Sequence, residues 1–146
     1  MYHAIVRASV RRLWAEIEES GDHRGAVALA ASNLQFTFAG PPGIGVTLQG
    51  RDAFDAWFAD VFRTFPGLRL HAQDIVVRGW PSGTTVIVRL NIEATLADGT
   101  AYRNQGIQWV TLRWGRMVRD EVLEDTAVLA AGVATQRNAG VARSAS

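Results

Sequence analysis

The second half of the chain constrains the fold most, because its side chains change character at every second residue over four long stretches. Such alternation is typical of strands, in which successive side chains point to opposite faces. Asp98-Gly99, between two of these stretches, is a strong signal for a two-residue turn. Long strands joined by short turns form an antiparallel meander. The predicted strands cover about residues 68–79, 84–97, 100–114 and 116–124.

Helical periodicity dominates the first half, where apolar residues recur three and four positions apart. The clearest helix carries one aromatic stripe over residues 54–65, and Pro66-Gly67 stops it. Ser20-Gly21 ends the first helix, and Asp22 is expected to cap the second. The other elements are predicted as helices at about 2–19, 23–31 and 126–132 and as strands at 34–38 and 46–49.

These elements predict one α+β domain over residues 1–133, with helices first and a curved sheet after them. The chain has 146 residues, which fits one domain, and 48% of them are apolar, enough for a core. Residues 134–146 are small and polar, so we predict a flexible C-terminal tail there.

The charge balance and the residue types that are missing exclude several functions. A net charge of +1 gives no field that would attract nucleic acid or an anionic membrane. Without cysteine there is no disulfide and no thiolate nucleophile, and without lysine there is no Schiff base. No stretch approaches the roughly 18 apolar residues of a membrane span, and the N-terminus lacks the apolar segment of a signal peptide. We therefore expect a cytoplasmic protein.

Cofactor and metal motifs are also missing from the sequence. His3, His23 and His71 are scattered and show no metal-binding spacing. There is no glycine-rich phosphate loop and no G-x-S-x-G nucleophile elbow. We expect neither a metal ion nor a cofactor.

Several short motifs follow one another in a recognisable order. They are Ser20-Gly21-Asp22, Phe36-Thr37-Phe38, Gly50-Arg51-Asp52-Ala53, Phe65-Pro66-Gly67, the run from Gly99 to Gly106, and Glu124-Asp125-Thr126. Together with the order of elements, over about residues 2–132, they resemble the nuclear transport factor 2-like fold and, within it, the SnoaL-like polyketide cyclase family. The resemblance implies a cone in which N-terminal helices pack on a curved antiparallel or mixed sheet around a pocket. It also implies a homodimer formed through the sheet.

Two rows of side chains alternate along the predicted strand 84–97. One row is apolar from Val86 to Ile92, and the other carries Arg89 and Asn91. Because the concave face of this fold meets the pocket and its convex face often builds a dimer, we assign the polar row to the pocket. The alternative is that the apolar row covers the core and that Arg89 and Asn91 face water.

The candidate catalytic residues are Asp125, Arg89 and Asn91. Arg89-Leu90-Asn91 resembles the Arg-x-Asp element of limonene-epoxide-hydrolase-like enzymes, in which two aspartates act as acid and base and the arginine bridges them. Asp125 corresponds to the second aspartate, but Asn91 replaces the first and cannot donate a proton as an acid. SnoaL-like cyclases use an acidic residue near the pocket, which implies this role for Asp125. Its alternative role is to cap the helix that follows.

The candidate ligand-binding residues combine aromatic rings with amides. Asn104 and Gln108 can hydrogen-bond a ligand carbonyl, or alternatively bond across strands. At positions where ketosteroid isomerase carries its tyrosine and two aspartates, this chain has Trp14, Phe38 and Gln108, so that isomerisation is not expected. The rings predicted to line the pocket, with plain core packing as the alternative, are Trp14, Phe36, Phe38, Trp57 and Phe58.

The resulting expectation is a SnoaL-like protein that binds a hydrophobic small molecule in an apolar pocket. The favoured activity is acid/base catalysis of the cyclisation or isomerisation of a carbonyl compound, although the sequence leaves open whether the protein is an enzyme. The alternatives are a non-catalytic binding module and a divergent epoxide hydrolase. A purely structural dimerisation subunit would instead have a filled core.

Overall fold

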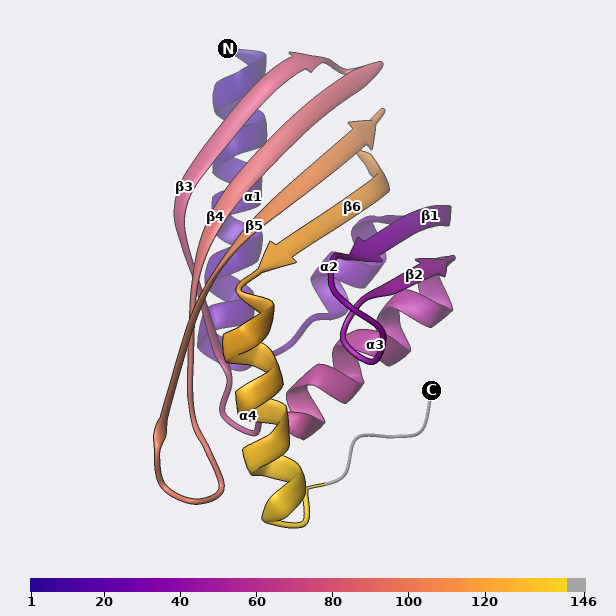
Figure 1. Ribbon diagram of the computed structural model, residues 1–146. Helices are drawn as coiled ribbons and strands as arrows, with labels where there is room; N and C mark the ends of the chain where they lie inside the picture. The colour runs from indigo at the N-terminus through magenta and orange to yellow at the C-terminus, as the bar shows by residue number, and fades with distance from the viewer. Residues whose placement is uncertain (142–146) are drawn as a thin grey trace.

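In the computed structural model, which describes residues 1–141, helices and strands follow the predicted order (Figure 1). The α+β class is therefore confirmed. The elements are α1 (Tyr2–Ser20), α2 (Arg24–Leu29), β1 (Ala30–Phe38), β2 (Val46–Gln49), α3 (Arg51–Thr64), β3 (Arg69–Trp80), β4 (Gly83–Thr95), β5 (Ala101–Arg113), β6 (Arg116–Glu124) and α4 (Thr126–Asn138). No helix among the described residues is long and apolar enough to cross a membrane.

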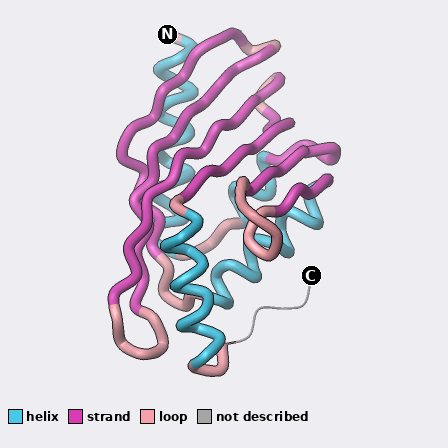
Figure 2. The backbone as a smooth tube through the Cα atoms, in the orientation of Figure 1, coloured by secondary structure: helices cyan, strands magenta, loops and turns pink. Residues whose placement is uncertain are grey.

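All six strands form one sheet in the order β2-β1-β6-β5-β4-β3. The strands β3 to β6 make the predicted antiparallel meander, and β1 joins it by pairing with β6 in parallel. Figure 2 shows the meander as long, strongly curved strands, with helices gathered on one side. In Figure 1, α1 runs behind β3, β4 and β5, while α3 lies close to β1 and β2 and α4 continues from the end of β6.

The apolar row of β4 faces the core, so the predicted assignment of its two faces is wrong. The residues from Val86 to Ile92 on this row are buried, whereas Arg89 and Asn91 are exposed on the opposite face. Burying each large aliphatic side chain is worth about 1.5–3 kcal/mol. Burying an arginine and an asparagine without partners would cost free energy instead, so the row of four aliphatic residues decides which face turns inward.

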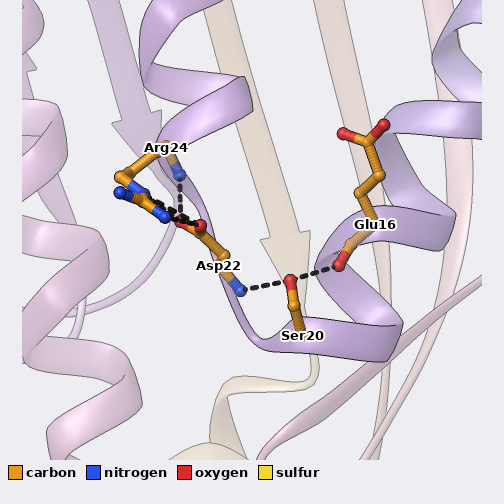
Figure 3. Close-up of polar contacts among 4 residues, drawn as sticks. All are labelled: Glu16, Ser20, Asp22 and Arg24. Carbon is orange, nitrogen blue, oxygen red and sulfur yellow. Dashed lines mark hydrogen bonds and ion pairs between the residues drawn. The ribbon is translucent and has the colours of Figure 1, made fainter.

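The end of α1 follows the predicted chemistry (Figure 3). Gly21 adopts the left-handed conformation (φ 65°) that ends a helix without steric cost. The Ser20 hydroxyl donates to the Glu16 carbonyl oxygen at 2.6 Å and accepts from the Asp22 backbone N–H at 3.2 Å. The chain leaves α1 with these terminal groups satisfied and turns back toward α3.

Asp22 acts one residue earlier than a helix cap would. The N-cap position of α2 belongs to His23, and Asp22 accepts from the Arg24 backbone N–H at 2.9 Å. The same carboxylate pairs with the Arg24 guanidinium at 2.6 Å, as Figure 3 shows. The helix ends at Leu29 rather than near 31, because Ala30 is already extended and pairs with Met117 of β6.

The last helix is longer than predicted and reaches into the predicted tail. α4 continues to Asn138, and the side chain of Gln136 is buried. Its Oε1 accepts from the Ala97 backbone N–H at 2.8 Å, and its Nε2 donates to the Thr64 carbonyl at 2.8 Å. A flexible tail beginning at residue 134 is therefore wrong for residues 134–138. The backbone N–H groups of residues 139–141 bond back to carbonyls of α4, and residues 142–146 lie outside the described part of the chain.

Candidate functional site

Two adjoining cavities lie between the sheet and the helices. The first, here the α4 cavity, has a volume of about 80 Å³ and is bordered by Leu129 and Val133 of α4. The second, here the α2 cavity, has a volume of about 50 Å³ and is bordered by Ala26 and Leu29 of α2. The purely structural alternative, which required a filled core, is not what the molecule shows. Four residues border both cavities: Trp14, Phe58, Gln108 and Asp120.

Asp120 is the most unusual residue of this hollow. Its neighbours in the sheet are Phe36 of β1 and Val110 of β5, and it is fully buried. Gln108 Nε2 donates to Asp120 Oδ2 at 3.1 Å, but Oδ1 has no hydrogen-bond partner. Burial raises the pKa of Asp120 to about 7, and the hydrogen bond from Gln108 opposes that rise. The carboxyl group can therefore both give and take a proton near neutral pH.

Glu124 lies four residues further along the same strand, on the same face. It borders the α4 cavity, and burial raises its pKa to about 7 as well. Asn104 Nδ2 lies 3.3 Å from Glu124 Oε1 and 3.0 Å from the Tyr102 hydroxyl. Burial also raises the pKa of Tyr102 to about 12, so its hydroxyl stays protonated. One end of the α4 cavity thus carries an acid and a phenol tied by an amide.

Asp125 caps α4 and borders neither cavity. Its Oδ1 accepts from the backbone N–H groups of Ala127 and Val128 at 3.1 and 3.2 Å, and the residue is exposed. Arg89 and Asn91 lie on the outer face of the sheet, so the predicted convergence of these three residues inside a pocket is wrong. The physical reason is strand alternation: Asp120, Val122 and Glu124 point inward, and β6 has ended where Asp125 begins the helix.

The epoxide-hydrolase alternative loses its geometric requirement for the same reason. It needed Arg89 within reach of Asp125, yet Arg89 is exposed on the outer sheet face and Asp125 bonds the backbone of α4. Among residues 1–141, no arginine borders either of the two cavities.

Most of the predicted ligand-binding residues do surround the hollow. Trp14, Phe38, Trp57, Phe58 and Gln108 border the α4 cavity, although their contact with a ligand stays a prediction. The other two lie behind its wall. Phe36 packs its ring 4.6 Å from that of Trp57, and Asn104 is buried against Glu124.

Sequence reasoning missed Asp120 and Glu124. The signal was the alternation Asp120-x-Val122-x-Glu124, with Glu121 and Leu123 on the other face. The pairing of β5 with β6 is irregular near Leu112 and Met117. This irregularity changes which residues of β6 point inward, so the alternation cannot be followed from the start of the strand. Over the described residues, no three His, Asp or Glu side chains are grouped so that they could hold a metal ion.

Comparison with known proteins identifies the family and the fold of the chain. Residues 10–120 match the family model of the SnoaL-like domain, and a sequence search of curated proteins gives no match. The crystal structure of TerC co-crystallised with polyporic acid is similar at a TM-score of 0.71 and 21% identity, covering 88% of this chain and 97% of that one.

Two further solved structures share the architecture. PrhC from Penicillium brasilianum NBRC 6234 gives a TM-score of 0.76 at 14% identity, over 96% of this chain and 92% of that one. A protein with a ketosteroid isomerase-like fold from Catenulispora acidiphila DSM 44928, in complex with trimethylamine, gives 0.68 at 14% identity, over 84% and 90%. These likenesses confirm the nuclear transport factor 2-like fold, and the family match covers most of the chain. The chain belongs to the SnoaL-like domain family.

Proposed function

We propose that this protein binds a small hydrophobic carbonyl compound in the hollow and catalyses its cyclisation or isomerisation by proton transfer, with Asp120 as the acid/base. The observation that carries the proposal is Asp120 Oδ1, which is buried at the junction of two apolar cavities and has no protein partner. An unpartnered buried oxygen costs free energy, which a bound ligand can recover.

The chemistry follows from the state of the two carboxyl groups. Near pH 7 a large fraction of Asp120 is ionised, and Oδ1 takes a proton from an acidified C–H while Gln108 holds Oδ2 in place. Protonated Asp120 then returns the proton to another atom of the substrate, which suits general acid–base catalysis.

Glu124 supplies the second polar contact. When protonated, Glu124 donates a hydrogen bond to the carbonyl oxygen as negative charge develops there. Its Cα lies about 13 Å along the strand from that of Asp120, since a strand rises about 3.3 Å per residue. The acidic carbon and the carbonyl oxygen of a ketone are two bonds apart, so both side chains have to lean toward the same substrate.

Hydrogen exchange into a simple ketone tests the role of Asp120. The probe is 2-indanone in D₂O, followed by the loss of its C–H signals by NMR. We expect exchange above the buffer rate, lowered about 10²- to 10⁴-fold by Asp120→Asn. Asp125→Asn is the matched control, because asparagine also caps helices and Asp125 lies outside the hollow. Exchange lost in the control and kept in Asp120→Asn would overturn the assignment.

A non-catalytic binding module is the second candidate. The observation that favours it is that Asp125, the predicted acid, bonds only the backbone of α4 in the contacts described. TerC was crystallised with polyporic acid, and the Catenulispora protein with trimethylamine. If the chain binds a ligand but neither wild type nor Asp120→Asn exchanges protons, the binding module is the correct candidate.

The predicted homodimer also remains a proposal, with the outer face of the sheet as its interface. Val76, Ile107, Trp109 and Leu123 are exposed there, and the Arg78 guanidinium lies 5.6 Å from the Trp109 ring centre. Asp74 and Glu121 lie on this face as well, next in register to Arg89 and Trp109, so a second copy can match its charges to them. We expect Ile107→Glu to be a monomer by light scattering, whereas Ser9→Glu on α1 should remain a dimer. A monomeric wild type would reject the proposal.

A further inference from the structure

The two cavities meet at a partition made from both layers of the fold. Trp14 of α1 and Phe58 of α3 form its helix side, and Gln108 of β5 and Asp120 of β6 form its sheet side. Asp120 therefore borders both cavities at once. A molecule that presents a reacting atom to Asp120 has the α4 cavity on one side and the α2 cavity on the other.

The two cavities differ in chemistry. The α4 cavity is bordered by Glu124 and Tyr102, which can hydrogen-bond an oxygen atom of a ligand. The α2 cavity has Gln108 and Asp120 at the partition as its polar residues, and aliphatic or aromatic side chains form the rest of its wall. Apolar cavities of this kind exclude water and bind hydrocarbon groups.

The volume of the α2 cavity limits what it can take. One water-sized group needs roughly 10–15 Å³ by this measure, so about 50 Å³ holds about four such groups. The same measure gives the α4 cavity, at about 80 Å³, room for about six. The hollow as a whole suits a molecule of about ten non-hydrogen atoms.

Trp14 and Phe58, the helix side of the partition, differ in how their rings are packed. Phe58 is held by ring contacts with His23, Phe54, Trp57 and Phe62 at centroid distances of 5.3 to 5.9 Å. Within the described part of the chain, the Trp14 ring makes no comparable aromatic contact. Trp14 is nonetheless buried, so both rings form part of the wall between the two cavities.

We infer that the α2 cavity is a separate subsite for an apolar substituent of about four carbon atoms. The substrate class is a ketone with a short alkyl substituent next to its acidic carbon, placed so that this carbon lies beside Asp120 and the oxygen points toward Glu124. This inference rests on the proposed function for the position of the reacting carbon, but the subsite itself can be tested by binding alone.

A series of methyl ketones from 2-butanone to 2-nonanone measures the subsite directly. Dissociation constants are taken from the shift of the Trp14 indole N–H resonance. Each buried methylene contributes about a three- to fourfold gain in affinity. We expect the gain to continue for about four carbons and then to level off, because the α2 cavity is full.

Two variants that each add three carbons, one in each cavity, separate the cavities. Ala26→Leu adds three carbons to the wall of the α2 cavity, and the gain should level off about three carbons earlier. Leu129→Phe adds three carbons to the α4 cavity, and it should weaken all ketones by a similar factor while the levelling point stays in place. If Ala26→Leu does not fold, Val86→Ile adds one methyl group to the α2 cavity and should shorten the series by one carbon.

The outcomes distinguish this inference from the proposed function. A chain-length profile that Ala26→Leu and Val86→Ile leave unchanged would overturn the subsite, even if Asp120→Asn abolishes proton exchange. A profile that shifts as expected supports the subsite, even if wild type exchanges no protons, in which case only the proposed catalysis fails. Asp120→Asn should itself keep the wild-type length profile.

Discussion

The two faces of the sheet each carry a cluster of polar side chains, and the clusters differ in solvation rather than in residue type. On the inner face, Asp120 and Glu124 are enclosed by apolar side chains, and burial raises the pKa of both to about 7. On the outer side, His71 Nδ1 and Nε2 lie 2.7 Å from the carboxylates of Glu18 and Glu93. The proposed reactivity therefore lies on the inner face, where Asp120 Oδ1 is buried without a hydrogen-bond partner.

The outer cluster shows how hydrogen-bond partners change the direction of a pKa shift. Burial alone would lower the pKa of His71, but its hydrogen bonds to Glu18 and Glu93 raise it overall. A charged imidazolium between two carboxylates is satisfied and has no free lone pair for chemistry. Asp120 has one satisfied oxygen and one unsatisfied oxygen, which leaves it free to act on a ligand.

The largest expected effect concerns stability against pH. The pKa of Asp120 is about 7 in the folded state, whereas the ordinary value for an aspartate is 3.8, so folding favours its neutral form. This stabilisation is complete below about pH 4 and is lost as the pH rises through 7. The loss is about 4 kcal/mol, since one pKa unit corresponds to about 1.4 kcal/mol.

Urea denaturation across pH 4 to 9 measures this effect. Asp120→Asn should remove most of the loss and leave a smaller slope from Glu124. Glu19→Gln on α1 is the control and should keep the wild-type slope, because Glu19 is exposed and is not among the groups that shift the pKa of Asp120. Parallel curves for wild type and Asp120→Asn would mean that Asp120 is not held neutral by burial.

A smaller effect is expected from Gln108. Gln108→Leu removes the hydrogen bond to Asp120 Oδ2 that holds the pKa down, so the pKa should rise further. The pH midpoint of ketone proton exchange should move up by about one to two units, because a hydrogen bond to a charged group is worth about 1.5–3 kcal/mol. A midpoint that stays at the wild-type value would show that the amide does not support the carboxylate.

The smallest effect belongs to the outer cluster. His71→Gln should lower stability by less than about 1 kcal/mol, because the two glutamates are largely exposed and solvent screens the pair. The raised pKa of His71 places this contribution at low pH, and it is lost as the pH rises through that pKa. Denaturation midpoints of wild type and His71→Gln, measured at pH 5.5 and pH 9, test this. The two proteins should differ only at the lower pH. A larger loss at pH 9 would contradict the ion-pair explanation.

Element order was predictable because periodicity and turn residues are local properties of the chain. The helix of residues 54–65 and the Asp98-Gly99 turn both follow from neighbours in sequence. Which face of a strand turns inward is decided by the whole core, and this is why Arg89 and Asn91 were placed on the wrong side. For β4 the aliphatic row alone would have given the right answer.

The candidate site was harder to predict than the fold. Trp14, Phe38 and Gln108 border the α4 cavity as expected, because they replace polar residues of a related family; their contact with a ligand stays a prediction. Asp120 was missed because the irregularity near Met117 breaks the alternation just before it. Asp125 was favoured instead because its position matched a family pattern, whereas capping, a local interaction, accounts for it fully.

The parallel pairing of β1 with β6 has a kinetic consequence. Phe36 and Asp120 are far apart in sequence, and closing such a loop costs entropy before any contact repays it. The β3–β6 meander needs only neighbouring segments, so it can assemble first. The insertion of β1 then covers the Asp120 carboxyl group. Proton uptake by Asp120 during refolding near pH 6 would therefore report the rate at which β1 docks.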